Sequence, residues 1–259
     1  MSALTNIAEW LRCPVCHGSL RLDGRTLGCE ARHSFDLARQ GYVNLLGHGA
    51  PKNADTSDMI AARDRFLSAG HYAPIAEAVA EAVADAGRVL EVGAGTGHYL
   101  AEALGQEAWG LATDVSVPAM KRAAKAHPRM GAIVADTWAG LPLKDDSVDA
   151  LLCIFAPRNL DDFRRILRPG GRMIVVVPNT GHMRTVRERH GLMDVAEDKA
   201  QQLLAALPDA SSRRIRFDLH LDAQAATDLV GMGPNAHHAD REIEAMSVNV
   251  DVTLLVAKQ

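Results

Sequence analysis

The stretch that decides the fold is Val89-Leu-Glu-Val-Gly-Ala-Gly-Thr-Gly97, where a short apolar run passes through three glycines into a segment of helical periodicity. Glycines at such a turn let a ligand approach the main chain closely. A dinucleotide site has the pattern G-x-G-x-x-G, but here the third glycine, Gly97, comes one residue early. Glu91 would repel a pyrophosphate and attract a cation. The stretch therefore favours a cofactor with positive charge and no phosphate.

Two further acids follow the next predicted strands. Asp114 ends the strand 108–113, and Asp136 ends the strand 132–135. An acid after the second strand can accept hydrogen bonds from ribose hydroxyls, and one after the third can accept from an adenine amino group. Together with Glu91 they indicate an adenosine nucleoside with a sulfonium centre, S-adenosylmethionine. The alternative is that each aspartate only forms a turn or caps a helix.

Strands and helices alternate from residue 87 onward, which predicts an α/β, Rossmann-like fold with a doubly wound, mostly parallel sheet. The predicted strands are 88–92, 108–113, 132–135, 148–155, 173–177, 217–221 and 248–256. The predicted helices are 59–68, 75–86, 96–104, 117–126 and 160–167. Turn-forming and polar residues fill 47–58, which is typical of a linker, and Thr56 or Ser57 can cap the helix that follows.

Three cysteines and a histidine before the linker have the spacing of a metal site. The pattern is Cys13-x2-Cys16-x12-Cys29-x3-His33, and two such pairs supply the four donors of a tetrahedral zinc ion. The segment is too short to bury a core of its own, so a metal would supply folding energy. Buried thiols with a chance histidine are the alternative, and His17 competes with His33 as the fourth donor.

The composition limits the other classes of protein. The chain has 259 residues, 47% of them hydrophobic and 23% charged, with a net charge of −4. This balance excludes a disordered chain and a uniformly basic nucleic-acid binder. No apolar run approaches the ~20 residues of a membrane-spanning helix, and the N-terminus lacks a secretion signal. The predicted location is therefore the cytoplasm, where a buried Cys153 would be a small core residue.

Several stretches resemble a known family. The zinc pattern and the stretches 40–46, 70–74 and 91–97 occur in this order in the bacterial 23S ribosomal RNA guanine-N1 methyltransferases, and the resemblance covers nearly the whole chain. The stretches 155–159, 168–171 and 232–234 resemble the branch linked to tylosin and mycinamicin resistance.

The resemblance implies an enzyme that methylates N1 of a guanine in a 23S ribosomal RNA hairpin, which could confer macrolide resistance. It implies a homodimer whose zinc module helps to hold the RNA, with no membrane or DNA partner. The implied organisation is a zinc-binding RNA-recognition module (1–46), a linker and helix (47–70), and a methyltransferase domain that uses S-adenosylmethionine (71–259). The implied zinc ligands are Cys13, Cys16, Cys29 and His33, and the implied cofactor contacts are Tyr72, Gly95, Thr96 and His182.

The complete set of predicted cofactor residues joins these contacts to the glycine turn and the acids: Tyr72, Glu91, Gly93, Gly95, Thr96, Gly97, Asp114, Asp136 and His182. In this fold the loop after the fourth strand faces the transferred methyl group. Phe155 can stack on the target base, and Arg158 and Asn159 can hydrogen-bond its edge. The alternative for Asn159 is a helix cap. No residue of the loop is an evident general base.

Positive charge is concentrated in three segments. Residues 117–130 carry +4, residues 158–190 carry +5 and residues 211–217 carry +3, which leaves −16 for the remainder. We expect the zinc module, Arg158 and the arginines near 184–189 and 213–216 to line one RNA cleft, completed if necessary by a second subunit. Solvated helix surfaces without a partner are the alternative. A small-molecule methyltransferase and a non-catalytic RNA-binding module are the competing functions.

Overall fold

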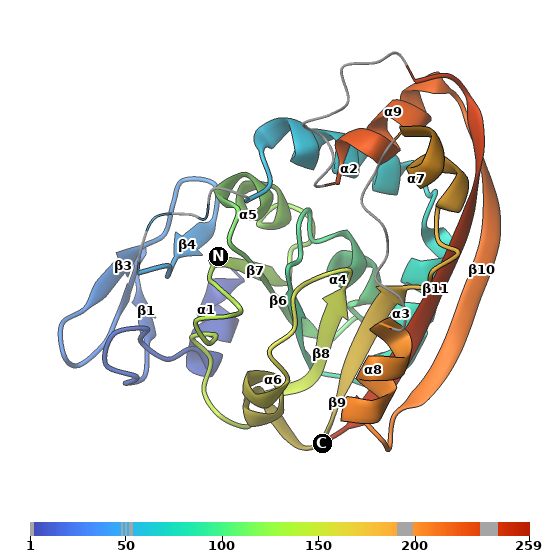
Figure 1. The fold of residues 1–259 in the computed structure, drawn as a ribbon. Coiled ribbons are helices and arrows are strands. Elements are labelled where there is room, and N and C mark those ends of the chain that lie inside the picture. The colour runs from blue at the N-terminus through green and yellow to red at the C-terminus, as the bar shows by residue number, and fades with distance from the viewer. Residues whose placement is uncertain (1–2, 48, 50, 52–53, 191–198, 234–242) are drawn as a thin grey trace.

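The computed structural model describes residues 3–47, 49, 51, 54–190, 199–233 and 243–259. Its centre is an eight-stranded sheet in the order β10-β11-β9-β8-β5-β6-β7-β4 (Figure 1). The strands are β4 (Tyr42–Asn44), β5 (Arg88–Val92), β6 (Trp109–Asp114), β7 (Met130–Val134), β8 (Val148–Ile154), β9 (Leu167–Pro178), β10 (Ser211–Leu221) and β11 (Met246–Lys258). Neighbours from β4 to β9 are parallel, and β11 and β10 are antiparallel additions. This confirms the predicted α/β fold with a mostly parallel sheet.

Helices cover both faces of the sheet. They are α1 (Leu4–Ile7), α2 (Ser57–Ser68), α3 (Ala73–Ala82), α4 (His98–Ala103), α5 (Val117–Ala123), α6 (Leu160–Ile166), α7 (Arg184–His190), α8 (Lys199–Ala206) and α9 (Ala223–Gly231). Thr56 caps α2, since its side chain accepts a hydrogen bond from the Met59 amide at 3.3 Å. Helices α1, α7, α8 and α9 and the edge strand β4 are additional to the elements predicted from the sequence. No helix in the described residues is long and apolar enough to cross a membrane.

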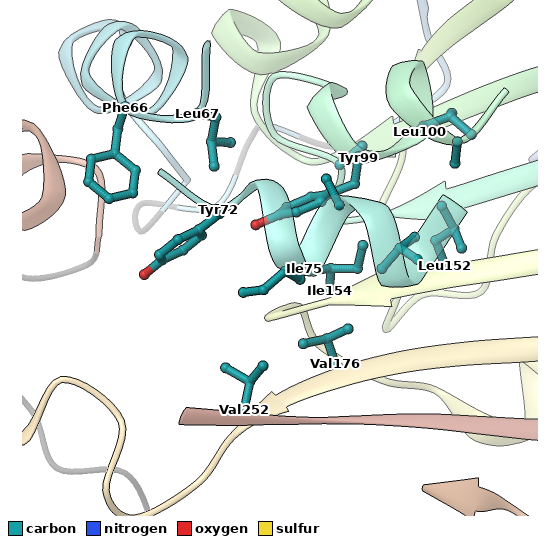
Figure 2. Close-up of a cluster of buried hydrophobic side chains, with 14 of the residues drawn as sticks. Phe66, Leu67, Tyr72, Ile75, Tyr99, Leu100, Leu152, Ile154, Val176 and Val252 are labelled. Carbon is teal, nitrogen blue, oxygen red and sulfur yellow. The ribbon is translucent and has the colours of Figure 1, made fainter. Parts of the chain in front are cut away.

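The side chains of β8 alternate between two buried clusters, one on each face of the sheet. Leu152 and Ile154 pack in the cluster under α2, α3, α4 and α9, whereas Leu151 and Cys153 pack in the cluster with α1, α6 and α8. Figure 2 shows the first cluster, in which Ile75 of α3 faces the strand residues. Because every residue of β8 is buried, the strand is apolar almost throughout.

The N-terminal segment combines a small antiparallel sheet with elements that join the main core. The small sheet comprises β1 (Arg21–Asp23), β2 (Thr26–Gly28) and β3 (Ser34–Asp36). Leu4 and Ile7 of α1 pack on the main sheet, where a Cβ at Gly131 would lie 2.9 Å from Leu4 Cδ2. β4 then extends the main sheet beside β7. The partition at residues 46 and 70 remains a prediction.

The sheet order separates the basic segments from one another. The zinc module lies at the β4 edge, whereas Arg213, Arg214 and Arg216 lie on β10 at the opposite edge (Figure 1). Seven strand spacings of about 4.8 Å place these edges roughly 30 Å apart. Arg213 and Arg214 are also ion-paired, with Glu81 and Asp251. The zinc module and the arginines of β10 therefore do not adjoin within one chain, so a cleft that includes both would need a second subunit.

We expect the ion pair between α2 and α9 to stabilise the fold. Arg65 Nη2 lies 2.5 Å from Asp228 Oδ1, and Asp228 is buried. Arg65→Ala should lower the free energy of unfolding by about 2 kcal/mol, because it leaves a buried carboxylate without its partner. Urea unfolding of the zinc-loaded protein measures this loss.

Arg213→Ala is the matched control, because Arg213 and Glu81 are both mostly exposed. It should cost less than about 1 kcal/mol. Equal losses in the two variants would contradict a special role for the α2–α9 pair.

Candidate active site and metal centre

The four predicted metal ligands come together in the N-terminal segment. The donor atoms of Cys13, Cys16, Cys29 and His33 all lie within 4.8 Å of one another. Cys16 Sγ and Cys29 Sγ are 3.7 Å apart, and His33 Nδ1 is 3.5 Å from Cys13 Sγ and 3.4 Å from Cys29 Sγ. In a tetrahedral site with Zn–S bonds of about 2.3 Å, sulfur atoms lie roughly 3.8 Å apart. The donor set and its spacing therefore fit a structural zinc ion.

Two turns hold these ligands. The first closes where the Cys13 amide donates to the Gly18 carbonyl at 2.7 Å, and the second where the Cys29 amide donates to the His33 carbonyl at 3.1 Å. His17 has a φ of 59° in the first turn and is not part of the donor cluster. His33 is therefore the fourth donor, as the pairwise spacing predicts.

The turn after β5 has a conformation that requires glycine. Gly93, Gly95 and Gly97 have φ values of 61°, 54° and 75°. A Cβ at Gly93 would lie 2.5 Å from Ala156 Cβ, and a Cβ at Gly97 would lie 2.8 Å from Met130 Cε. The turn is thus packed between the chain after β8 and the start of β7.

Thr96 makes the turn a candidate binding site. Its hydroxyl is buried and has no hydrogen-bond partner among the described residues. Buried polar groups are nearly always paired, so an unpaired one in a glycine turn suits a hydrogen bond to a bound molecule. Arg63 of α2 reaches the same turn, with Nη1 2.7 Å from the Cβ position of Gly95 and 2.6 Å from Asp55 Oδ2. The sequence analysis missed Arg63, because helical spacing does not show what a polar side chain faces.

The three predicted acids lie at the carboxyl ends of neighbouring strands. Asp114 Oδ2 accepts from the Gly95 amide at 2.9 Å, and its Oδ1 accepts from the Ser116 amide at 2.9 Å. Asp136 Oδ1 accepts from the Trp138 amide at 2.9 Å. Each aspartate thus has a turn-forming hydrogen bond, and Asp114 also fixes the glycine turn. Carboxylate oxygens accept more than one hydrogen bond, so both keep acceptor capacity for a nucleoside.

Glu91 is buried and resists ionisation. Its Oε2 accepts from the Leu100 amide at 3.2 Å. Burial raises the pKa of Glu91 to about 8, and the negative charge of Asp114 adds to the effect. Burial also raises the pKa of Asp114, against the hydrogen bonds from Ser116 and Gly95. A cation bound beside these acids would favour their ionised forms.

The rings of Phe155, His182 and Tyr72 lie close together at the chain after β8. Phe155 has a φ of 55°, which is strained for a bulky residue, and 40% of its surface is exposed. Its ring centroid lies 6.0 Å from that of His182, in a stacked arrangement, and 6.3 Å from that of Tyr72. Tyr72 is buried and donates to Met183 Sδ at 3.5 Å. Figure 2 shows its ring between α2 and the sheet.

His182 is held as a neutral hydrogen-bond donor. Its Nδ1 accepts from the Asp251 amide at 3.2 Å, which leaves the proton of the neutral ring on Nε2. Burial, together with the positive charge of Arg187, lowers the pKa of His182 to about 4, although the negative charge of Asp251 opposes this shift. An isolated histidine in a loop would ordinarily be exposed to solvent. Burial is decided by β11, which pairs with β9 and brings Asp251 to this loop.

Arg158 and Asn159 make different hydrogen bonds within the chain. Asn159 caps α6 by accepting from the Asp162 amide at 3.3 Å, and its Nδ2 donates to the Thr137 carbonyl at 3.2 Å. Both polar atoms therefore serve the fold, as the alternative interpretation expects. Arg158 donates to the Ala156 carbonyl at 3.3 Å and has no ion pair with a described carboxylate. Contacts of either residue with a substrate remain predictions.

We expect Cys16→Ser to lose the zinc ion. Serine is a poor zinc ligand, so the 11–46 region should lose its metal-dependent stability while the glycine turn remains intact. Zinc measured by mass spectrometry should fall from one ion per chain, and affinity for S-adenosylmethionine by calorimetry should be nearly unchanged. Purified wild-type protein without zinc would contradict the assignment.

Burial of Glu91 predicts a pH dependence of stability. Between the ordinary value of 4.5 and about 8, the folded protein holds a proton that the unfolded chain has released. The contribution of Glu91 is therefore largest at low pH and is lost as the pH rises through 8. Glu91→Gln keeps an acceptor for the Leu100 amide and removes this titration.

Urea unfolding of the zinc-loaded, cofactor-free protein at about pH 6 and about pH 9 tests this point. The wild type should lose more stability between these values than Glu91→Gln. Parallel losses would show that Glu91 does not titrate in this range.

The chain matches two family models. Residues 11–48 match a zinc ribbon described as RlmA, N-terminal, and residues 89–171 match a methyltransferase domain. Both models agree with the geometry of the two sites. A chain in the complex between the Haloferax volcanii Trm112 methyltransferase activator and its methyltransferase has a similar fold. Its TM-score is 0.51 at 20% identity, over 79% of this chain and 97% of that one.

Three relatives align with most of the chain. A 23S rRNA (guanine(748)-N(1))-methyltransferase of Streptomyces fradiae is 45% identical over 91% of this chain and 88% of its own. A protein of Micromonospora griseorubida, named as a candidate 23S rRNA (guanine-N(1)-)-methyltransferase, is 45% identical over 95% of both chains. A similarly named Bacillus subtilis protein is 30% identical over 95% of both.

These findings confirm an enzyme that uses S-adenosylmethionine and a structural zinc ion. The identity of 45% over 91% and 95% of the chain exceeds what a shared fold alone produces. The chain belongs to the family of 23S rRNA (guanine-N1)-methyltransferases.

Proposed function

We propose that this enzyme transfers a methyl group to N1 of a guanine in a hairpin of 23S ribosomal RNA. The observation that carries the proposal is the loop after β8, where an exposed aromatic ring and a guanidinium without an ion pair to any described carboxylate adjoin the cofactor turn. Phe155 offers a ring face to a base, and Arg158 offers donors to its edge. The names of the relatives support 23S rRNA as the substrate and guanine N1 as the methylated atom.

The residues around Phe155 have three proposed roles: stacking on the base, donating hydrogen bonds to it, and keeping the cofactor turn close to the substrate. When bound, S-adenosylmethionine supplies an electrophilic methyl group. Phe155 stacks on an unpaired guanine and excludes water from one of its faces. Arg158 donates to the guanine O6, where negative charge develops as the N1 proton leaves. His182 offers its Nε2 proton from a fixed ring. Gly93 keeps the turn close to Ala156, so the cofactor and the base can approach each other.

The bond changes require a proton acceptor. The bond between N1 and the methyl carbon forms as the sulfur–carbon bond breaks, and the N1 proton leaves. Burial raises the pKa of Tyr72, and it raises the pKa of Cys153 to about 12. His182 uses Nδ1 to accept from the Asp251 amide. The proton therefore passes to solvent water, and catalysis depends on positioning and on charge stabilisation.

A homodimer is part of the proposal. The basic segment of β10 and the zinc module lie at opposite edges of one sheet. A second copy could place its own β10 edge, with Arg213 and Arg216, beside the zinc module of the first. Light scattering should give twice the mass of the chain, and a monomer that methylates RNA at full rate would reject the dimer.

Macrolide resistance is a further part of the proposal. It is supported if expression of the protein raises the inhibitory concentration of tylosin in a sensitive host.

Arg158→Ala should slow methyl transfer more than it weakens RNA binding. An interaction with developing charge acts mainly in the transition state, so the single-turnover rate should fall on the order of 100-fold. The measurement uses a 23S hairpin with saturating S-adenosylmethionine, and primer extension locates the methylated guanine.

Arg164→Ala is the control for lost positive charge. Arg164 lies on the following helix, α6, and pairs with the exposed Asp161. Its rate should remain close to that of the wild type. Equal rates for Arg158→Ala and the wild type would exclude Arg158 from the chemistry. A wild type that methylates no RNA would reject the proposed substrate.

A further inference from the structure

Three large hydrophobic side chains are exposed among the described residues. They are Val15, Trp138 and Phe155, with 62%, 67% and 40% of their surfaces exposed. Aromatic residues make up only 4% of the chain, and single exposed hydrophobic residues are common on protein surfaces. Their placement decides whether they have a role. Val15 belongs to the zinc turn, Phe155 to the active-site loop and Trp138 to the connection between β7 and β8.

The connection between β7 and β8 joins the zinc module to the active site. At its start, the Thr137 carbonyl accepts from Asn159 Nδ2 at 3.2 Å. At its end, Leu143 forms a β-bridge with Leu11, and the Pro142 carbonyl accepts from the Arg12 amide at 3.0 Å. In Figure 1 this connection runs beside α1. The connection that carries Trp138 is therefore joined by hydrogen bonds both to the zinc module, which carries Val15, and to the loop after β8, which carries Phe155.

Trp138 is fixed at its backbone and exposed at its ring. Its amide donates to Asp136 Oδ1 at 2.9 Å, and the preceding Thr137 is buried. The backbone of the loop is thus already ordered, so stacking of the indole on a flat partner costs little further conformational entropy. Through Asn159, this backbone is joined to the loop that holds Phe155 and Arg158. Arg158 has no ion pair with a described carboxylate, so its guanidinium is available to the edge of the target base.

We propose that Trp138 stacks on an unpaired base of the RNA substrate next to the target guanine. This inference rests on the proposed function. Base–aromatic stacking tolerates any base, because every base has a π-face. Trp138 thus adds affinity for a single-stranded loop without selecting its sequence, while Phe155 receives the target. The two rings would separate neighbouring bases and so favour a hairpin loop over a paired stem.

The competing partner for the indole is the adenine of the cofactor, since Asp136 is a predicted adenine contact. The two partners are separated by fluorescence. Trp10 is buried and Trp109 is half-buried, so Trp138 is the tryptophan most open to a ligand. The 23S hairpin should quench the emission of the wild-type protein, and S-adenosylhomocysteine should leave it nearly unchanged. Trp138→Leu should remove the quenching by RNA.

Binding measurements then test the role of the ring. Trp138→Ala should weaken binding of the hairpin about 5- to 100-fold, the range expected for one lost base stack. Trp138→Phe should recover most of the affinity, and Trp109→Phe is the control for an unrelated tryptophan. The affinity for S-adenosylhomocysteine should be the same in all variants.

Each other outcome overturns the inference. Quenching by S-adenosylhomocysteine, or weaker binding of that molecule to Trp138→Ala, would assign the indole to adenine. Full RNA affinity in Trp138→Ala would leave the proposed function intact and reject the stacking role. A wild type that neither binds nor methylates the hairpin would reject both.

Discussion

The active site depends on close packing of the glycine turn against the chain that follows β8. A Cβ at position 93 would lie 2.5 Å from Ala156 Cβ, so only glycine brings the two loops together at this distance. The turn also takes positive φ values that other residues adopt at a cost. Because β5 and β8 are parallel neighbours, their carboxyl ends meet at one edge. The cofactor turn and the candidate substrate loop are therefore adjacent by topology.

Electrostatics at this edge differ from those of the rest of the surface. Glu91 is buried without a cation, and its pKa is raised to about 8 by that burial. Several arginines elsewhere pair with carboxylates inside the chain, as Arg65 does with Asp228 and Arg214 with Asp251. Glu91 and Asp114 thus place acid where a cationic cofactor would bind, and Arg158 in the neighbouring loop forms no ion pair with a described carboxylate.

The zinc module is coupled to the methyltransferase sheet through shared packing. Leu4, Ile7 and Leu11 belong to the same buried cluster as the strand residues Leu90 and Leu151. β4 adds an edge strand to the sheet. The zinc module is therefore joined to the candidate substrate loop, because the connection that pairs with Leu11 also contacts that loop through Asn159.

The sequence by itself determined the α/β alternation, the zinc donors and the turn 93–97, because each depends on local spacing or on residue type. It also placed Asp114 and Asp136 at strand ends, which the register of β6 and β7 confirms. Only the tertiary structure decided that β11 inserts between β9 and β10, that His182 is therefore buried with a fixed tautomer, and that the arginines of β10 lie at the edge opposite the zinc module. These features follow from which strands pair, and the free energy of pairing comes from side chains far apart in the sequence, so local periodicity does not encode it.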